Sequence, residues 1–234
     1  MKYVMQFKQF SIRHDRVAMK VGMDGVLLGA WTSVENVKTI LDVGTGSGVI
    51  ALMLAQRTTD SVRVDAVEIS DDAHQAAENF SASPWNDRLR AYQSSVQELE
   101  VEEPYDLIVT NPPYYVDALK PPDPRRERAR HDRSLRHDEI VAAANRLLST
   151  HGRLSIILPH AESKSFETLA ARQGFYCSRV CEVQSKPNKP PIRRLMEFER
   201  TPYPTRRSSL CLFDISGEPS AEYRSLTADF YLNF

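Results

Sequence analysis

The sequence has few of the features that mark a secreted, membrane-bound or globally basic protein. Its 234 residues include three cysteines, Cys177, Cys181 and Cys211, and no Cys-x-x-Cys pair, so we expect reduced packing residues in a cytoplasmic protein. No apolar run reaches the length of a membrane span, and the N-terminal residues lack the apolar core of a signal peptide. The net charge is -1, so no overall basic field attracts nucleic acid.

The six histidines show no metal-ligand spacing, so no metal site is predicted, and nothing indicates an obligate protein partner. Hydrophobic residues make up 41% of the chain and charged residues 26%, which is ordinary for a globular protein. No Gly/Ser-rich linker divides the chain. We therefore expect a single domain, 1–234, with an N-terminal extension at 1–35 and a core at 38–234.

The most informative motif is Asn-Pro-Pro-Tyr at 111–114, directly after the apolar run 105–110. Two prolines cannot continue a sheet, so the chain must leave a strand there, and ligands of open α/β sheets bind at the carboxyl ends of strands. The side-chain oxygen of Asn111 and the carbonyl of Pro112 can accept hydrogen bonds from an NH2 group. Pro113 makes the corner rigid, and Tyr114 can stack on a flat group. The motif indicates a site for a planar amine; the simpler alternative is a turn.

A glycine loop follows another apolar strand, at 40–48 (ILDVGTGSG), and leads into a helix. Glycine permits a tight turn and a close approach of ligand to backbone. A dinucleotide fingerprint would need glycine at position 49, which is Val49, and no lysine follows as in a phosphate-binding P-loop. Asp42 would repel a pyrophosphate and would suit a positively charged ligand such as S-adenosylmethionine.

The next apolar run, 61–67, ends at Glu68, which lies 26 residues after Asp42. This is a reasonable length for a strand, a helix and a second strand. A carboxylate at the end of the second strand can accept hydrogen bonds from both hydroxyls of a ribose. Each acidic residue alone could be a solvated strand end. The ordered set of glycine loop, Glu68 and Asn-Pro-Pro-Tyr indicates a nucleoside site beside an amine site.

Hydrophobic periodicity predicts a mostly parallel α/β sheet flanked by helices. Residues 3–13 are expected to form one or two short strands, and Asp24 to cap a helix. The expected strands are 39–43, 62–68, 88–92, 105–110 and 152–158, then a hairpin-like pair at 175–184 and 193–200 and a last strand near 209–214. The expected helices are 48–57, 71–81, 137–149 and 161–172, with a short closing helix within 219–231.

With these motifs, the chain resembles the amino-methyltransferase branch of the class I S-adenosylmethionine-dependent methyltransferases. Residues 19–31 (MKVGMDGVLLGAW) resemble the entry segment of the bacterial tRNA1(Val) adenine-37 N6-methyltransferase family. So do residues 130–135, 152–159 and 222–231, so the resemblance covers nearly the whole chain. It implies a Rossmann-like fold with a mostly parallel seven-stranded sheet and an antiparallel C-terminal hairpin, and an extension at 1–35 that covers the cofactor site.

The resemblance also implies the site residues. The catalytic residues would be Asn111, Pro112, Pro113 and Tyr114. The residues binding S-adenosylmethionine would be Lys20, Asp42, Gly44, Thr45, Gly46, Gly48, Glu68, Ile69, Ser95, Val96 and Asn111. Related enzymes often carry Asp after the third strand, where it contacts the adenine of the cofactor. Here that segment is QSSVQ at 93–97, and we expect Ser95 and the backbone of Val96 to replace the acid.

Two local stretches are basic although the whole chain is not. Residues 120–136 contain seven Lys/Arg against three acids, and residues 186–207 contain seven against two. Such clusters beside an active-site corner are typical of phosphate contacts, although solvated loops give the same pattern. The predicted RNA-binding residues are Arg125, Arg126, Arg128, Arg130, Lys186, Lys189, Arg193 and Arg194. A role for His131 at phosphate or substrate is left open.

The expected reaction is N6-methylation of an adenine in tRNA, with the target base turned out of its stack. Four alternatives share parts of the pattern. A DNA adenine methyltransferase would normally need a separate target-reading region, for which 234 residues leave little room. A protein-glutamine N5-methyltransferase has the same corner, but the basic stretches argue against it. An rRNA guanine-N2 methyltransferase would use the same chemistry. A catalytically inactive RNA-binding module would need no intact glycine loop, Glu68 or Asn111.

Overall fold

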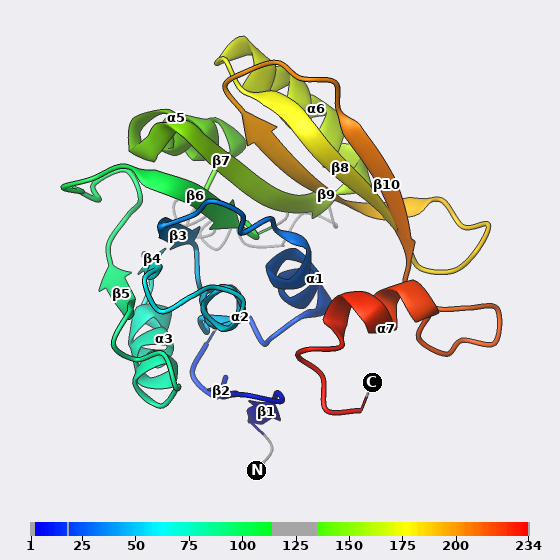
Figure 1. Cartoon of the computed structure of the whole chain (residues 1–234), viewed down its shortest axis with the longest axis horizontal. Coiled ribbons are helices and arrows are strands. Elements are labelled where there is room, and N and C mark those ends of the chain that lie inside the picture. The colour runs from blue at the N-terminus through cyan, green and yellow to red at the C-terminus, as the bar shows by residue number, and fades with distance from the viewer. Residues whose placement is uncertain (1–2, 18, 114–134, 234) are drawn as a thin grey trace, which may run out of the picture.

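A computed structural model, which describes residues 3–17, 19–113 and 135–233, has a central eight-stranded sheet with helices on both faces (Figure 1). Its strands are β3 (Thr39–Val43), β4 (Arg63–Glu68), β5 (Leu89–Gln93), β6 (Tyr105–Thr110), β7 (Leu148–Pro159), β8 (Tyr176–Gln184), β9 (Pro191–Glu199) and β10 (Arg206–Cys211). They lie in the order β10-β8-β9-β7-β6-β3-β4-β5. Only β9 runs antiparallel to its neighbours, β7 and β8.

The sheet therefore has the predicted mostly parallel α/β architecture with a C-terminal hairpin, but eight strands instead of the predicted seven. The family resemblance implied seven strands, but the strand expected near 209–214 also joins the sheet as β10, which pairs in parallel with β8 and forms the sheet edge. It begins at Arg206, three residues before the strand expected near 209–214. The hairpin β8–β9 is consequently an inner part of the sheet, because β10 covers its outer side.

Helices cover the two faces in separate groups. On one face lie α1 (Met23–Trp31), α2 (Val49–Gln56), α3 (Asp72–Ser81) and α7 (Ala221–Thr227), and on the other α5 (His137–Leu147) and α6 (His160–Arg172) (Figure 1). Alternate strand residues serve the two cores: Ile40 packs with the first group, and its neighbour Leu41 with the second. This alternation follows from the two-residue period of a strand, so strands buried on both faces are apolar throughout.

The boundary between α5 and β7 also differs from the prediction. Helix α5 ends at Leu147 and β7 starts at the next residue, whereas the helix was expected to reach 149 and the strand to start at 152. The register of β6 against β7 shifts between Tyr105 and Leu107, so the early part of β7 pairs as an irregular extension. The cap of α1 is Gly22, and Asp24, the predicted cap, lies in the first turn.

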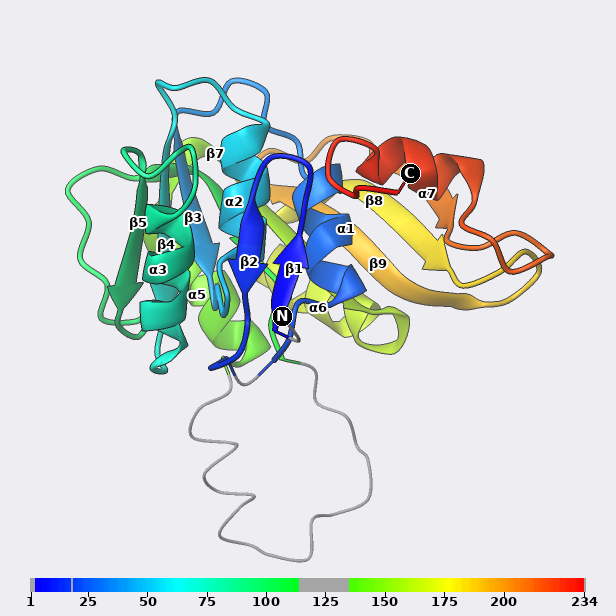
Figure 2. The same cartoon turned by 90° about the horizontal axis from the view of Figure 1, so that it is seen from below.

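A separate two-stranded hairpin, β1 (Val4–Gln6) and β2 (Ser11–Arg13), lies over α1, α2 and α3 (Figure 2). Asn79 of α3 connects it to the glycine loop: its amide accepts from the Arg13 backbone N–H at 3.0 Å and donates to the Ser47 carbonyl at 2.8 Å. At the hairpin turn, Phe7 stacks on Tyr231 with ring centroids 5.9 Å apart. The N-terminal and C-terminal segments of the described chain thus pack together beside the core.

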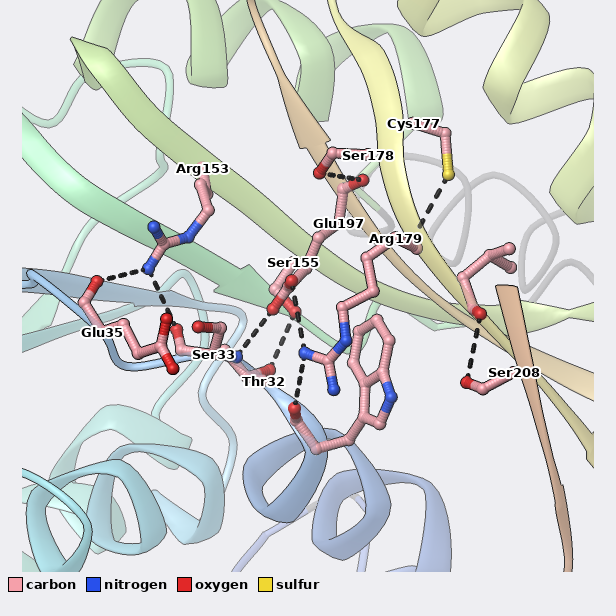
Figure 3. Close-up of polar contacts among 12 residues, drawn as sticks. Thr32, Ser33, Glu35, Arg153, Ser155, Cys177, Ser178, Arg179, Glu197 and Ser208 are labelled. Atoms are coloured by element: carbon pink, nitrogen blue, oxygen red, sulfur yellow. Dashed lines mark hydrogen bonds and ion pairs between the residues drawn. The ribbon is translucent and has the colours of Figure 1, made fainter. Parts of the chain in front are cut away.

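A buried carboxylate ties the end of α1 to the sheet (Figure 3). Glu197 of β9 is 1% exposed and accepts hydrogen bonds from the Ser33 backbone N–H at 2.7 Å and from Arg179 at 3.3 Å. The Arg179 guanidinium also lies 3.9 Å from the Trp31 ring centroid. A buried charge is tolerated only when it is paired and hydrogen-bonded, and this network meets that need while it attaches the end of α1 to β8 and β9.

Candidate active site

A cavity of about 1170 Å³ opens at the carboxyl ends of the parallel strands. This volume exceeds the roughly 300–1,000 Å³ of a typical single-ligand pocket, so the cavity has room for more than one ligand. One wall consists of residues 43–47, 67–72 and 94–97 from the ends of β3, β4 and β5. The opposite wall consists of residues 19–25, 135–136, 139, 183, 192–193 and 212. Asn111 and Pro113 at the end of β6 lie between the two walls.

The glycine loop forms its turn through left-handed backbone conformations. Gly44 has φ of +71° and Gly46 of +54°, and a Cβ built on either would meet no atom within 4 Å. Both glycines line the cavity together with Thr45. Their bare backbone therefore faces open space, as a ligand that packs directly on the main chain requires. Gly48, by contrast, faces Phe80 and is absent from the cavity wall, so its role is to fit the loop against α3.

Asp42 lies behind the glycine loop, which corrects the prediction that it faces the charged ligand. It is 0% exposed and does not line the cavity. One carboxylate oxygen accepts from the Thr45 hydroxyl at 2.6 Å and the Ala51 backbone N–H at 3.2 Å. Burial raises the pKa of Asp42 to about 7, against the two hydrogen bonds that lower it. Asp42 thus stabilises the glycine loop. It can influence a bound ligand only indirectly, by holding Thr45, which lines the cavity.

Glu68 lines the cavity at the end of β4 and uses both carboxylate oxygens. One accepts from the Gly46 backbone N–H at 3.1 Å, and the other from the Ser70 N–H and hydroxyl, both at 3.0 Å. A carboxylate oxygen has further acceptor capacity beyond these bonds. The half-buried Glu68 is therefore held in one orientation at the rim, where a vicinal diol can reach it.

The proline corner lies where the sequence predicted it. The Thr110 hydroxyl donates to the Val43 carbonyl at 2.9 Å, which joins the ends of β6 and β3. Asn111 and Pro113 line the cavity, and Pro112 is buried behind them. A Cβ built on Gly25 of α1 would lie 4.0 Å from Asn111 Nδ2, so α1 closely backs this amide. Tyr114 lies outside the described residues.

The segment after β5 completes the first wall. Ser95 and Val96 both line the cavity, as do Lys20 and Ile69. The Ser95 hydroxyl donates to Glu98 at 3.0 Å, and the side chain of Val96 is buried. The Ser95 hydroxyl is therefore already hydrogen-bonded. Where related enzymes often carry Asp, this segment presents its backbone and a hydroxyl to the cavity.

The predicted RNA-binding residues fall into four groups, of which Arg194 forms the last. Arg125, Arg126, Arg128 and Arg130, like His131, lie outside the described residues. Lys186 and Lys189 are exposed in the turn between β8 and β9, at the same end of the sheet as the cavity. Arg193 lines the cavity, and its Nε donates to Asp24 at 2.9 Å.

The prediction for Arg194 is wrong, because its side chain points into the layer of α6. It is 3% exposed and donates to Glu167 at 2.6 Å and to Ser163 at 3.3 Å. Successive residues of a strand face opposite sides, so of two adjacent arginines only one faces the cavity. The sequence shows two adjacent basic residues but not the direction in which each side chain points.

Sequence reasoning missed most of the second wall. No individual site role was predicted for Asp24, which was expected to cap a helix, or for Gly25, Val183, Ile192 and Leu212. Each comes from an element distant in sequence. Only the packing of α1 against the C-terminal strands brings them to Asn111.

Within the described ranges, no cluster of three or more His, Cys, Asp and Glu side chains is arranged to bind a metal ion. In the same residues, no helix is long and apolar enough to cross a membrane.

The fold has close structural counterparts. A predicted O-methyltransferase from Agrobacterium tumefaciens superposes with a TM-score of 0.67 at 16% identity, covering 88% of this chain and 96% of that one. A T. thermophilus 16S rRNA N2 methyltransferase, solved with AdoMet and guanosine, superposes with a TM-score of 0.59 at 20% identity, covering 85% of this chain and 50% of that one. At identities this low, the structural similarity shows that the fold is shared and nothing further.

Residues 26–174 match the family model of the methyltransferase small domain, so the chain belongs to that family and is a methyltransferase of Rossmann-like fold. A protein from Tolumonas auensis is 44% identical over 227 residues, covering 97% of this chain and 95% of that protein. That relative is named tRNA1(Val) (adenine(37)-N6)-methyltransferase, and the chain is a member of this family.

Proposed function

We propose that this enzyme methylates N6 of adenine 37 in the anticodon loop of tRNA1(Val), with S-adenosylmethionine as methyl donor. The observation that carries the proposal is that Asn111 and Glu68 open into one cavity, from strands on either side of β3. An amine acceptor site and a ribose site therefore meet at the same edge of the sheet. The name of the Tolumonas auensis relative supports the choice of adenine and of tRNA.

The residues present fit the donor. Glu68 is oriented to accept from ribose hydroxyls, the Gly44–Gly46 backbone faces open space, and the wall adds Ser95 and Val96 for the adenine ring. Lys20 and Ile69 would close the site from the rim. S-adenosylmethionine supplies an electrophilic methyl group, so the protein's own contribution is mainly position.

Asn111 would orient the acceptor. Its side-chain oxygen and the Pro112 carbonyl would accept hydrogen bonds from the N6 amino group and favour a more pyramidal nitrogen. These bonds strengthen as positive charge develops on that nitrogen, which is the condition for catalysis. Pro113 stiffens the corner, and Tyr114 would stack on a base turned out of the loop. Adenines of a single-stranded loop need less unstacking than those of a duplex.

The RNA would approach from the basic side of the cavity. Lys186 and Lys189 project from the β8–β9 turn at the cavity end of the sheet. Arg125, Arg126, Arg128 and Arg130 follow the proline corner in the sequence. Changing the first three to Glu should raise the KM for tRNA and flatten its salt dependence, with cofactor affinity unchanged. We place this activity in the cytoplasm, within a single domain whose residues 1–35 are an extension over the cofactor site.

Transfer of labelled methyl tests the substrate. Undermethylated bulk tRNA, a release-factor protein, ribosomal RNA and duplex DNA are offered in parallel, and the modified nucleoside is identified by mass spectrometry. N6-methyladenosine in tRNA is expected, and mapping should place it at position 37. Label in protein, or N2-methylguanosine in ribosomal RNA, would refute the proposed substrate but not the proposed transfer of a methyl group to a planar amine.

The Asn111→Ala variant tests the mechanism. Its kcat should fall by about a hundredfold or more, with tRNA affinity nearly unchanged, because the lost interaction acts mainly in the transition state. Glu102→Ala, at an exposed position in the loop before β6, is the matched control.

A further inference from the structure

We infer that Arg193, oriented by Asp24, binds a backbone phosphate of the RNA beside the target adenine. The inference rests on the proposed function and names the contact that places the nucleotide at Asn111. Arg193 lies at the start of β9 and lines the cavity. Its partner Asp24 directly precedes Gly25, the α1 residue that lies against Asn111.

The contacts run through the first turn of α1. The Arg193 Nε donates to the Asp24 carboxylate at 2.9 Å. The next residue, Gly25, directly backs Asn111, since a Cβ there would lie 4.0 Å from the asparagine Nδ2. Arg193 is therefore connected to the acceptor amide through two consecutive helix residues.

The order of strands places Arg193 on the acceptor side of the cavity. Asn111 directly follows β6. On one side of β6 lie β3, β4 and β5, whose ends form the wall that would bind the cofactor, and on the other side β9 lies two strands away. With neighbouring strands about 4.8 Å apart, Arg193 starts from a strand roughly 10 Å from β6, away from Glu68. A group bound by Arg193 would therefore lie on the side of the target base that is remote from the cofactor.

The geometry of the guanidinium suits a phosphate. Its Nη1 donates to the Ile192 carbonyl at 3.0 Å in addition to the Asp24 bond, which orients the planar fork, and the side chain is 29% exposed. Arginine binds phosphate oxygens in bidentate fashion, and an oriented fork loses less entropy on binding. The adjacent Arg194 could not bind a phosphate in this way, because its side chain is buried against α6.

A chemical double-mutant cycle tests the contact. Wild type and Arg193→Gln are assayed on anticodon stem-loop RNAs in which one loop phosphate at a time is replaced by a neutral methylphosphonate. On unmodified RNA the variant should show a KM raised about tenfold or more, with kcat nearly unchanged. At one phosphate next to adenine 37 the replacement should raise the wild-type KM similarly and leave the variant unaffected.

Three further variants keep the result interpretable. Arg193→Lys should recover part of the affinity, because it keeps the charge and loses the fork. Asp24→Asn should raise the KM less than Arg193→Gln, because the arginine stays but is less well oriented. Arg172→Gln, at an exposed position at the end of α6, removes the same charge and should behave as wild type. Thermal melts show whether each variant folds.

Independent effects of variant and methylphosphonate at every position would overturn the inference. So would weakened S-adenosylmethionine binding in calorimetry with an unchanged KM for RNA, which would make Arg193 a cofactor residue. In both cases wild type would still methylate the stem-loop, so the proposed function would stand. Wild type that methylates no RNA would refute both.

Discussion

Glu197 on β9 accepts a 2.7 Å hydrogen bond from the backbone N–H of Ser33, just after α1 (Figure 3). The bond joins segments 164 residues apart. The last residue of α1, Trp31, also meets Arg179 of β8. The other end of the same helix carries Asp24 and Gly25 in the cavity wall. A clamp at one end of α1 therefore helps to position the residues that face the substrate at its other end.

Removing this clamp should destabilise the protein strongly. In Glu197→Ala, Arg179 and the Ser33 N–H lose a buried partner, and breaking a buried ion pair typically costs about 3–5 kcal/mol. Urea unfolding measures the change. The matched variant Glu102→Ala, at an exposed position, should stay within about 0.5 kcal/mol of wild type. Equal effects of the two substitutions would show that the network contributes nothing.

Two glycines of the same loop should respond differently to alanine. Both need a left-handed backbone, with φ of +71° at Gly44 and +86° at Gly48, which costs alanine about 1–2 kcal/mol. At Gly48 the new Cβ would also lie 2.5 Å from a ring carbon of Phe80, adding about 1–3 kcal/mol of overpacking. Gly44 faces the cavity, so Gly44→Ala should mainly weaken S-adenosylmethionine binding.

Urea unfolding and calorimetry together check this pair of variants. A larger loss of stability in Gly44→Ala than in Gly48→Ala, or weaker cofactor binding in Gly48→Ala alone, would contradict the assignment of the two positions.

Glu68 should control cofactor affinity. Glu68→Ala removes the ribose acceptor and the support of the Gly46 N–H, so binding of S-adenosylmethionine should weaken by about 1.5–3 kcal/mol, roughly 10- to 150-fold. Titration calorimetry measures it, with the exposed Glu102, which does not line the cavity, changed to Ala as control. An unchanged affinity, or equally tight binding of NAD to wild type, would refute the ribose role.

The buried Asp42 should make stability depend on pH. Burial raises its pKa from 3.8 to about 7 in the folded protein. Between these values the unfolded state binds fewer protons, so the free energy of unfolding falls as pH rises from about 4 to about 7. In Asp42→Asn this contribution disappears, on the order of 3 kcal/mol across that range. The nearby Glu68, whose charge also raises this pKa, remains in both proteins.

Urea unfolding of wild type and Asp42→Asn at about pH 5 and pH 7.5 measures this difference. The variant should lose less stability on going to the higher pH. Parallel curves for the two proteins would show that Asp42 is ionised throughout.

Much of the site could be predicted from sequence because its parts are local. The loop at Gly44–Gly46, the acid at Glu68 and the corner at Asn111 each follow an apolar strand directly. Parallel strands bring their carboxyl ends to one edge of the sheet, so sequence position alone determines that these residues meet. The inner strands β3, β4 and β6 are largely buried on both faces, and all strands apart from the extended β7 were predicted within a few residues.

Only the tertiary structure decided the roles of residues that depend on facing and on distant packing. Asp42 looks like a ligand-facing acid in sequence but lies behind the loop, because its side chain points to the N-terminal part of α2. Arg193 and Arg194 are adjacent and equally basic, yet one lines the cavity and the other is buried against α6. The pleat of a strand and the docking of α1 on β9 make these distinctions, and both depend on contacts between segments far apart in the chain.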